Sequence, residues 1–301
     1  MIKSPLHQWI DHARRILLPP TEPSDVWQEY RLARHLGLST RELADVRLGP
    51  RYHYRPFKIQ KPDGRERRIL APSPALKKLH RQLLTNYLST RPIHPAAAAF
   101  FPGASIAGNA RRHTGQALIA TVDLADFFET TSADRVRAFF VKDGWRGESL
   151  STLMRVCVYR GGLPQGAPTS PCLSNLVNVE LDDAVSEIAR RAGARYTRYG
   201  DDLTFSWRQD SAPGDFAPMV TDCVRYFGYE SQPRKGWAWR TKADAPQVTG
   251  VVIGPDGRLQ ASEKVRKEAR RIWWQWVWKG DEETESRLRG YEGFLKMLDE
   301  E

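Results

Sequence analysis

Cysteine and long apolar runs are both scarce in this 301-residue sequence. Its three cysteines, Cys157, Cys172 and Cys223, are too few for a disulfide framework and lack metal-ligand spacing. No apolar stretch approaches the roughly 20 residues of a membrane span. The N-terminus lacks the apolar core and the small-residue cleavage site of a signal peptide. We therefore expect a cytoplasmic protein with reduced thiols and no membrane partner.

Negative charge is in short supply as well, because 46 lysines and arginines face 36 aspartates and glutamates, for a formal net charge of +10. Such a balance favours a polyanionic partner, since each phosphate that is neutralised releases counterions. Charge alone distinguishes neither nucleic acid from an acidic membrane surface nor a binding face from a solvated one. The basic clusters are Arg65 with Arg67 and Arg68, Lys77 with Lys78 and Arg81, Arg111 with Arg112, and residues 264–271.

The most informative stretch is RYTRYGDDLTFS, residues 195–206, in which apolar or aromatic side chains alternate with polar ones. This period of two predicts a pair of strands. Gly200-Asp201 suits a tight turn between them, because Gly tolerates positive φ and Asp can bond its own backbone. The hairpin places Asp201 and Asp202 at its tip. Neighbouring strand side chains point to opposite faces, so a metal site here needs a further carboxylate from elsewhere.

Asp123 offers that carboxylate, since it ends the apolar run ALIATV of residues 117–122, which predicts a buried strand. A carboxylate in an apolar setting is costly unless it is paired or bound to metal. Mg²⁺ is commonly held by one or two carboxylates plus substrate phosphates, and two such ions promote phosphoryl transfer. We predict that Asp123 and Asp201 bridge two Mg²⁺ ions beside Asp202, with Mn²⁺ able to substitute. The simpler interpretation is that the Asp pair is only a polar turn.

The remaining pattern mixes helices and strands, which predicts an α+β chain. Apolar residues at helical spacing predict the helices, and alternating runs bounded by Gly and Pro predict the strands. The predicted helices cover residues 6–17, 24–36, 75–88, 172–192 and 216–226, and others begin at about Ser39, Ser132 and Ser262. The predicted strands form a long basic hairpin over residues 52–72 and one strand over residues 247–253.

The run WWQWVW, residues 273–278, would place tryptophan on every face of its helix. This excess of aromatic surface indicates a contact beyond the helix's own core. Stacking on nucleic acid and packing under a neighbouring helix are both open interpretations.

Several motifs in order resemble those of bacterial reverse transcriptases, and among them those of retrons, over about residues 52–255. YGDD is similar to the family's catalytic hairpin, in which Ala is common as the second residue, so Gly200 is a small departure. LPQGAPTSP, residues 163–171, is similar to the nucleotide-site loop. NARRH, residues 109–113, and VTG, residues 248–250, are similar to two short signatures of retron enzymes.

The resemblance implies a right-hand polymerase, and we divide the chain accordingly. Residues 1–50 would form an N-terminal helical extension, residues 51–115 the fingers, residues 116–254 the palm with interleaved finger elements, and residues 255–301 a helical thumb. The resemblance also implies that dNTPs are joined into DNA on a structured noncoding RNA, which serves as template and as primer through a guanosine 2′-hydroxyl. It further implies a link to antiphage defence through an effector protein.

The same resemblance implies roles for individual residues at the nucleotide site. Arg67 would bind the triphosphate, with Arg68 as its rival, because a planar guanidinium suits phosphate. Gln165 would contact the incoming sugar or base. Lys235 matches a lysine proposed to protonate pyrophosphate, although its neighbours depart from the usual family pattern.

The two retron signatures supply the candidate RNA-binding residues. These are Asn109 and His113 from the first signature, and Val248, Thr249 and Gly250 from the second. A lone histidine such as His113 is more often a hydrogen-bonded structural residue than a functional one, and that alternative stays open.

RNA-dependent RNA polymerases also carry a Gly-Asp-Asp hairpin, but they usually place an Asp about five residues after the first catalytic Asp, where it can bond a ribose 2′-hydroxyl. Phe128 holds that place here. We predict that Phe128 is a steric gate that selects deoxynucleotides, with packing beneath the palm as the alternative.

Two further alternatives remain for the whole chain. A group II intron-like or other defence reverse transcriptase is the nearer one, although such enzymes commonly carry larger thumbs or added domains. A non-catalytic RNA-binding scaffold or antitoxin belongs to a different class. The intact Asp123, Asp201, Asp202, Gln165 and Lys235 argue against lost catalysis.

Overall fold

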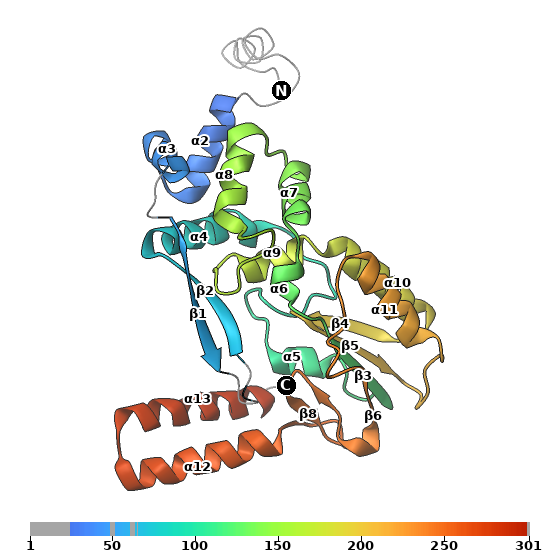
Figure 1. Ribbon diagram of the computed structural model, residues 1–301. Coiled ribbons are helices and arrows are strands. Elements are labelled where there is room, and N and C mark those ends of the chain that lie inside the picture. Colours follow the sequence, from blue (N-terminus) through green and yellow to red (C-terminus); the bar gives the residue numbers. More distant parts are fainter. Residues whose placement is uncertain (1–24, 49–51, 61–63, 65, 300–301) are drawn as a thin grey trace, which may run out of the picture.

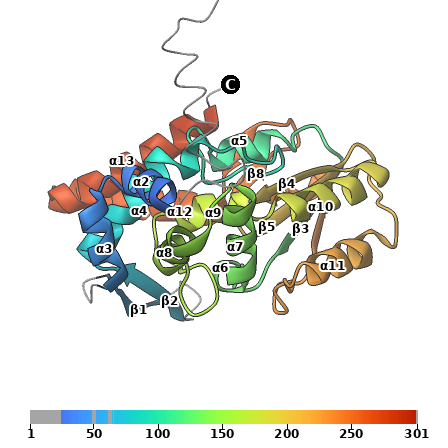
Figure 2. The same cartoon turned by 90° about the horizontal axis from the view of Figure 1, so that it is seen from above.

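Helices and small antiparallel sheets share the chain, so the predicted α+β class is confirmed (Figure 1). The computed structural model describes residues 25–48, 52–60, 64 and 66–299. The helix predicted over residues 6–17 lies outside these residues. Seen from above, residues 25–48 and 74–86 lie at one side of the molecule and residues 179–207 at the other (Figure 2).

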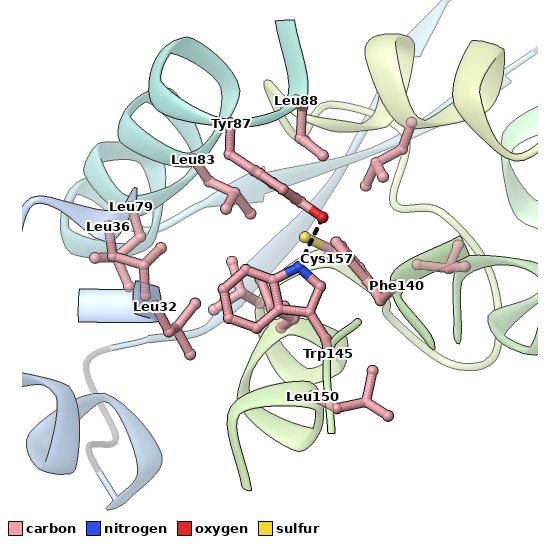
Figure 3. Packing of buried hydrophobic residues seen from close by; sticks show 14 of the residues in the cluster. Leu32, Leu36, Leu79, Leu83, Tyr87, Leu88, Phe140, Trp145, Leu150 and Cys157 are labelled. Atoms are coloured by element: carbon pink, nitrogen blue, oxygen red, sulfur yellow. Dashed lines mark hydrogen bonds between the residues drawn. The ribbon is translucent and has the colours of Figure 1, made fainter. Parts of the chain in front are cut away.

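A helical layer forms the part of the molecule nearest the described N-terminus. Its interior is one apolar cluster in which Tyr87, Phe140 and Trp145 are fully buried, and the Trp145 indole donates a hydrogen bond of 2.6 Å to the Tyr87 hydroxyl (Figure 3). A capping box opens the second helix as predicted, because the Ser39 amide donates to Glu42 and the Glu42 amide donates to the Ser39 hydroxyl. The helices are α2 (Asp25–Leu36), α3 (Thr40–Leu48), α4 (Pro74–Asn86), α7 (Ala133–Lys142) and α8 (Gly147–Cys157).

The predicted basic hairpin extends away from this layer (Figure 1). Strands β1 (Tyr54–Gln60) and β2 (Glu66–Pro72) pair antiparallel from Tyr54–Pro72 at the base to Gln60–Glu66 at the far end. Six of the seven β1 residues are exposed, and burial begins only at the base of β2. The hairpin is therefore anchored at one end, and its described cations, Arg55, Lys58, Arg67 and Arg68, are exposed.

A four-stranded antiparallel sheet holds the motifs that the sequence singled out. Its strand order is β4-β5-β3-β6. One face packs on α10 (Val179–Arg191) and α11 (Phe216–Tyr226), and the second apolar cluster fills the space between them. The strands are β3 (Leu118–Asp123), β4 (Arg195–Tyr199), β5 (Asp202–Trp207) and β6 (Ala238–Thr241).

The helix predicted over residues 172–192 is wrong in its continuity. The structure has two helices, α9 (Ser170–Leu176) and α10, separated at Val177 and Asn178. The Asn178 side-chain Nδ2 donates to the Ser174 carbonyl, and the side-chain Oδ1 accepts from Arg135 and the Tyr229 hydroxyl. These contacts compete with regular helix pairing and favour the break.

The single strand predicted over residues 247–253 is also wrong. Strands β7 (Gln247–Val248) and β8 (Val251–Ile253) form a tight hairpin, because Thr249 and Gly250 both adopt positive φ, at 50° and 84°. Two positive φ values in a row are typical of a two-residue hairpin turn. Strand β9 (Leu259–Ala261) completes a three-stranded sheet that spans the predicted domain boundary at residue 254.

A helical pair ends the described chain. Helix α12 (Glu263–Lys279) begins after Ser262, as predicted. The Ser262 hydroxyl accepts a hydrogen bond from the Val265 amide, and Gly280 ends the helix at φ 62°. Helix α13 (Glu282–Asp299) returns antiparallel, and its last turn packs with β7, β8, β9 and α5 (Ile106–Arg111). The pair lies across from the β1–β2 hairpin (Figure 1).

Candidate active site

The predicted catalytic hairpin is confirmed as a structural unit. Tyr199 pairs with Asp202, so Gly200 and Asp201 form a two-residue turn with Gly200 at φ 67°. Asp123 is the strand partner of Asp202, and directly opposed residues of an antiparallel pair share a face. The structure thus brings Asp123 and Asp202 together on β3 and β5, while Asp201 sits in the turn itself. Asp201 precedes β5, so the alternation of side chains along a strand does not set its direction.

Burial and the neighbouring charges raise the pKa values of Asp202 and Asp201. Burial is the largest cause at Asp202, the charges of Asp123 and Asp201 add to it, Lys235 opposes it, and together they raise its pKa to about 7. Burial also raises the pKa of Asp201, with Asp123 adding to the rise and with Lys235 and Arg67 opposing it. Carboxylates crowded in this way attract cations.

One of those cations is a side chain of the protein. Lys235 Nζ lies 2.7 Å from Asp123 Oδ1. The turn that carries Lys235 is fixed to the end of β3, because the Gln232 amide donates to the Asp123 carbonyl and the Lys235 amide donates to the Gln232 carbonyl. The sequence pattern around Lys235 departs from the family's, yet the fold brings this lysine to the predicted site.

The carboxylates suit a hard divalent cation in part. Asp202 Oδ1 is buried and accepts no hydrogen bond from the residues that the structure describes. Within the same residues, no three His, Cys, Asp or Glu side chains are set as a metal-holding group. Mg²⁺ needs only one or two carboxylates when substrate phosphates complete its shell, so the donor set fits a metal that binds together with a nucleotide.

A buried ion pair supports the hairpin from behind, and the sequence analysis missed it. Arg198 and Asp182 are both fully buried, and Arg198 Nη2 lies 2.7 Å from Asp182 Oδ2. Asp182 also accepts hydrogen bonds from Arg198 Nε and the Tyr196 hydroxyl, while Arg198 Nη1 donates to the Gly200 carbonyl at 3.2 Å. The pair therefore ties α10 to the catalytic turn. Its only sequence signal is an Arg that shares the strand parity of Tyr196.

The LPQG loop is fixed between the β1–β2 hairpin and α6 (Phe127–Thr130). The Leu70 amide donates to the Gln165 carbonyl at 2.7 Å, and the Leu163 amide donates to the Phe128 carbonyl at 2.9 Å. Two glycines permit this approach. A Cβ on Gly166 would lie 2.8 Å from the Leu70 carbonyl oxygen, and one on Gly162 would lie 2.0 Å from the Glu129 carbonyl oxygen. The loop thus joins the predicted triphosphate and sugar-binding elements.

The strand register separates the two candidate triphosphate arginines. Arg67 and Ile69 share one face of β2 because they are two residues apart. Ile69 points at the LPQG loop, with its Cγ2 3.0 Å from the position of a Cβ on Gly166. Arg67 therefore faces the same side as this loop and its charge acts on Asp201, whereas Arg68 belongs to the opposite face.

Phe128 belongs to a group of aromatic rings beside the turn. It is half-buried, and its ring centroid lies 5.5 Å from that of Phe127 and 6.1 Å from that of Phe100. Phe127 is buried against Tyr229. Of the two neighbouring phenylalanines, Phe127 is thus the core residue and Phe128 the one that reaches the surface near the site.

The candidate RNA-binding residues lie apart from the carboxylates and are largely inaccessible. His113 is fully buried, and its two ring nitrogens bond the hydroxyls of Ser206 and Thr197. Burial lowers its pKa to about 3, so the ring is neutral and matches the structural alternative. Asn109 and Val248 are also buried. Direct RNA contact by these three side chains is incompatible with their burial in this structure.

The remaining members of that prediction form a turn. Thr249 and Gly250 connect β7 to β8, and the Thr249 hydroxyl donates to the Ile106 carbonyl. The two retron signatures are therefore neighbours in space, because α5 carries one and the β7–β8 hairpin packs on α5 through the third apolar cluster. A role of these residues in RNA binding would be to hold the surface formed by α5 and the β7–β8 hairpin in position.

The tryptophans of α12 are mostly uncovered. Trp273, Trp274 and Trp278 are exposed, and Trp278 retains 83% of its accessible surface. Within the described chain, packing of α12 on α13 leaves all three side chains exposed, so the packing interpretation accounts for only part of their surface. None of the described helices is long and apolar enough to cross a membrane.

Comparison with known proteins agrees with this geometry. The model of the family "Reverse transcriptase (RNA-dependent DNA polymerase)" matches residues 59–253. The chain is 33% identical to the retron Mx162 reverse transcriptase of Myxococcus xanthus over 89% of this chain and 63% of that enzyme. It is 33% identical to the retron Mx65 reverse transcriptase of the same organism over 92% of this chain and 70% of that enzyme.

A third relative comes from a different organism. The chain is 30% identical to the retron Ec86 reverse transcriptase of Escherichia coli over 82% of this chain and 77% of that enzyme. Because the family match covers more than half of the chain and includes the carboxylates, the hairpin and the LPQG loop, the chain belongs to the reverse transcriptase family, among the retron reverse transcriptases.

Proposed function

We propose that the chain is an RNA-directed DNA polymerase of the retron type, which copies part of a structured noncoding RNA into single-stranded DNA. The observation that carries the proposal is the meeting of Asp123 and Asp202 at the ends of paired strands, beside the turn that holds Asp201. Family membership supplies the reaction class, and the relatives are named as retron enzymes.

The architecture fits a right-hand division of labour. The helical layer with the β1–β2 hairpin would act as fingers, the four-stranded sheet as the palm, and α12 with α13 as the thumb. Residues 25–48 pack into the finger core, which supports a structural role for the described part of the N-terminal extension.

The carboxylates would hold the metal ions. Asp123 and Asp201, with Asp202 beside them, are the proposed ligands of two Mg²⁺ ions, which Mn²⁺ can replace. When bound, the ions would supply a more acidic primer hydroxyl and charge neutralisation at the leaving oxygen. The protein's own contribution is to bury Asp202 Oδ1, to set Asp123 and Asp202 on paired strands and to deliver Lys235 to the same place.

The nucleotide would lie between the hairpin, the LPQG loop and α6. Arg67 is the better candidate for the triphosphate, because it faces the loop and its charge acts on Asp201. Gln165 would contact the sugar or base, since its backbone is fixed to β2. Lys235 is an ammonium held at Asp123, well placed to give a proton to pyrophosphate once the site is loaded.

Phe128 would exclude ribonucleotides. A ribose 2′-hydroxyl against the ring would lose solvation without gaining a hydrogen bond, at a cost of roughly 1–3 kcal/mol. A hundredfold preference requires about 2.7 kcal/mol in the transition state. Phe128 packs against two apolar clusters, but it remains half-buried whereas Phe127 is buried, and this partial exposure supports the gate.

The partners follow from the proposed reaction. These are a structured noncoding RNA as template and primer, its DNA product and dNTPs, in the cytoplasm, with priming from a 2′-hydroxyl. Asn109, His113, Val248, Thr249 and Gly250 would shape a surface for that RNA from beneath, and the exposed cations and tryptophans of α12 would contact it directly. An effector protein and a role in antiphage defence complete the proposal.

Primer extension tests this function. Purified chain, dNTPs and Mg²⁺ are supplied with an RNA template that carries a 3′ primer, and the product is sequenced. We expect templated DNA that disappears on chelation of the metal and that is not formed from rNTPs. A separate assay compares binding of the noncoding RNA encoded beside the gene with binding of a scrambled RNA of equal length. Absence of extension would contradict the polymerase, whereas equal binding would leave a generic polymerase and remove the retron assignment.

A further inference from the structure

A short segment between the helical layer and the sheet brings Phe100 to the catalytic turn. Residues 96–99 run beside β4, because the Arg198 amide donates to the Ala96 carbonyl and the Ala98 amide donates to the Arg198 carbonyl, both at 2.8 Å. The buried Asn175 side chain donates to the Ala99 carbonyl at 2.7 Å. The segment is therefore fixed up to the residue that precedes Phe100.

Phe100 itself has an unusual backbone. Its φ is +66°, a left-handed conformation that is rare for a bulky aromatic residue. Such a conformation persists only where the surroundings determine it, as the contacts of Ala98 and Ala99 do here. The side chain is only partly covered, with 38% of the residue's surface accessible. The backbone at Phe100 is thus strained, although the ring that it carries is not buried in the apolar core.

The ring lies against the turn that carries Asp201. Its Cζ and Cε2 atoms are 3.1 and 3.3 Å from the position that a Cβ on Gly200 would take. Its centroid lies 6.1 Å from that of Phe128 and 6.3 Å from that of Tyr199. Phe100 is therefore in contact with the turn and lies between the proposed sugar gate and the tyrosine before the turn.

This contact accounts for the departure of the hairpin from the Tyr-Ala-Asp-Asp pattern. A methyl group at residue 200 would crowd the Phe100 ring, and the φ of +67° at Gly200 is itself unfavourable for any residue with a Cβ. Gly200 and Phe100 thus fit one another, and the absence of a side chain on the turn makes room for the ring.

We propose that Phe100 is a specificity-determining residue of the nucleotide site: seated on Gly200, its ring holds Phe128 in the position from which Phe128 rejects a ribose 2′-hydroxyl. This inference rests on the proposed function, in which Phe128 is the gate. Phe128 packs against the apolar clusters of the helical layer and of the sheet, yet it remains half-buried, so part of its ring is covered by neither core. Its aromatic neighbours are Phe127, which belongs to the sheet cluster, and Phe100, which lies on the catalytic turn.

The test compares Phe100→Ala with Phe101→Ala. Phe101 is the next residue and is equally exposed, at 38%, but its ring makes no aromatic contact within the described chain, so it is the matched control. Single-nucleotide incorporation is measured with one dNTP and the matching rNTP. We expect Phe100→Ala to raise the ratio of rNTP to dNTP kcat/KM about tenfold. Phe101→Ala should leave the ratio unchanged.

Further variants separate the inference from the proposed function. If Phe128→Ala raises the ratio and Phe100→Ala does not, the gate stands and the role of Phe100 is refuted. If Phe128→Ala leaves the ratio unchanged, the gate itself is refuted and the inference fails with it. The double variant Phe100→Ala/Phe128→Ala should match Phe128→Ala alone, because Phe100 acts through Phe128. If the ratio in the double variant rose by the product of the two single-variant increases, that mechanism would be contradicted.

The seat on Gly200 has its own test. Gly200→Ala should lower dNTP incorporation, and Phe100→Ala in that background should restore part of it, because the ring that clashes with the new methyl group is gone. Equal losses with and without the ring would show that no such contact exists. Melting curves accompany every variant, and Phe100→Leu, which keeps apolar volume without a planar ring, replaces Phe100→Ala if the latter does not fold.

Discussion

The four-stranded sheet and the C-terminal helical pair use aromatic and charged residues in opposite ways. In the sheet, Phe205 and Trp207 are buried among rings of α11 and β6. On α12, Trp274 and Trp278 project into solvent. The aromatic side chains of the sheet pack in its core and hold the catalytic hairpin in place. The aromatic surface of α12 remains available for a partner.

The ion pairs follow the same division. Arg198 and Asp182 are fully buried beneath the catalytic turn, whereas Lys267–Glu263 and Arg271–Glu268 lie on the outside of α12. A buried pair fixes geometry because breaking it leaves an unpaired charge, while exposed pairs contribute little. This difference indicates that the residues around the catalytic turn are held in fixed positions, whereas the side chains on the outside of α12 can adjust to a partner.

The largest expected effect comes from breaking the buried pair. Asp182→Ala leaves Arg198 charged in the core, and we expect a loss of about 3–5 kcal/mol in the free energy of unfolding. Glu187→Ala is the control on the same helix, because it removes two exposed pairs, with Arg190 and Arg191. Urea denaturation should show no measurable change for the control. Similar midpoints for the two variants would show that the buried pair does not hold the sheet.

Acid tests the buried part of the molecule, because two buried histidines each lie between two hydroxyls, His80 in the helical layer and His113 beside the sheet. His80 contacts Tyr54 and Thr169, and burial lowers its pKa to about 3, as it does for His113. Since the folded pKa lies below the unfolded value near 6.5, the stabilisation is complete above pH 6.5 and declines as the pH falls toward 3. At pH 5.5 each histidine should cost about 1 kcal/mol.

Denaturation at several pH values measures this effect. His113→Gln should reduce the slope of stability against pH between 6.5 and 5, because one of the two protons taken up on unfolding is lost. Exposed His53 provides the control substitution, His53→Gln. A slope that is the same in His113→Gln and in the parent would contradict the assignment of a neutral buried ring.

The smallest effect on stability is expected on α12. The double variant Trp274→Ala/Trp278→Ala should have the same melting temperature as the parent protein, since both side chains are exposed. Its affinity for RNA should fall, because stacking contributes about 1–3 kcal/mol per base. The affinity of the parent should also decline steeply with salt, with log K falling by about 0.9 per log unit of salt for each duplex phosphate neutralised. Unchanged RNA affinity in the double variant would remove α12 from the interface.

Local chemistry made part of the structure predictable. Gly200-Asp201 fixed the hairpin turn, Ser39, Ser132 and Ser262 marked three helix starts, and the apolar run before Asp123 marked the central strand. These features depend on neighbours in sequence, so a short window is sufficient to identify them.

Contacts between distant residues were not predictable in the same way. The pairing of Asp123 with Asp202, the ion pair of Arg198 with Asp182, and the seat of Phe100 on Gly200 all depend on strand register and on segments far apart in the chain. The break at Asn178 has the same origin, because Arg135 and Tyr229 hold its side chain. Sequence reasoning thus found the reacting groups and missed the residues that position them.

The most direct test of the proposed catalytic carboxylates is the single-turnover rate of dNTP incorporation by Asp201→Asn on an RNA template with Mg²⁺. The substitution keeps the shape of the turn and removes the charge proposed to bind metal. Asp210→Asn, an exposed Asp just beyond the same hairpin, is the control. We expect Asp201→Asn to have the melting temperature of the parent protein and to lose activity by orders of magnitude, while Asp210→Asn keeps its activity. Incorporation at the parent rate by a folded Asp201→Asn would contradict the assignment of the catalytic carboxylates.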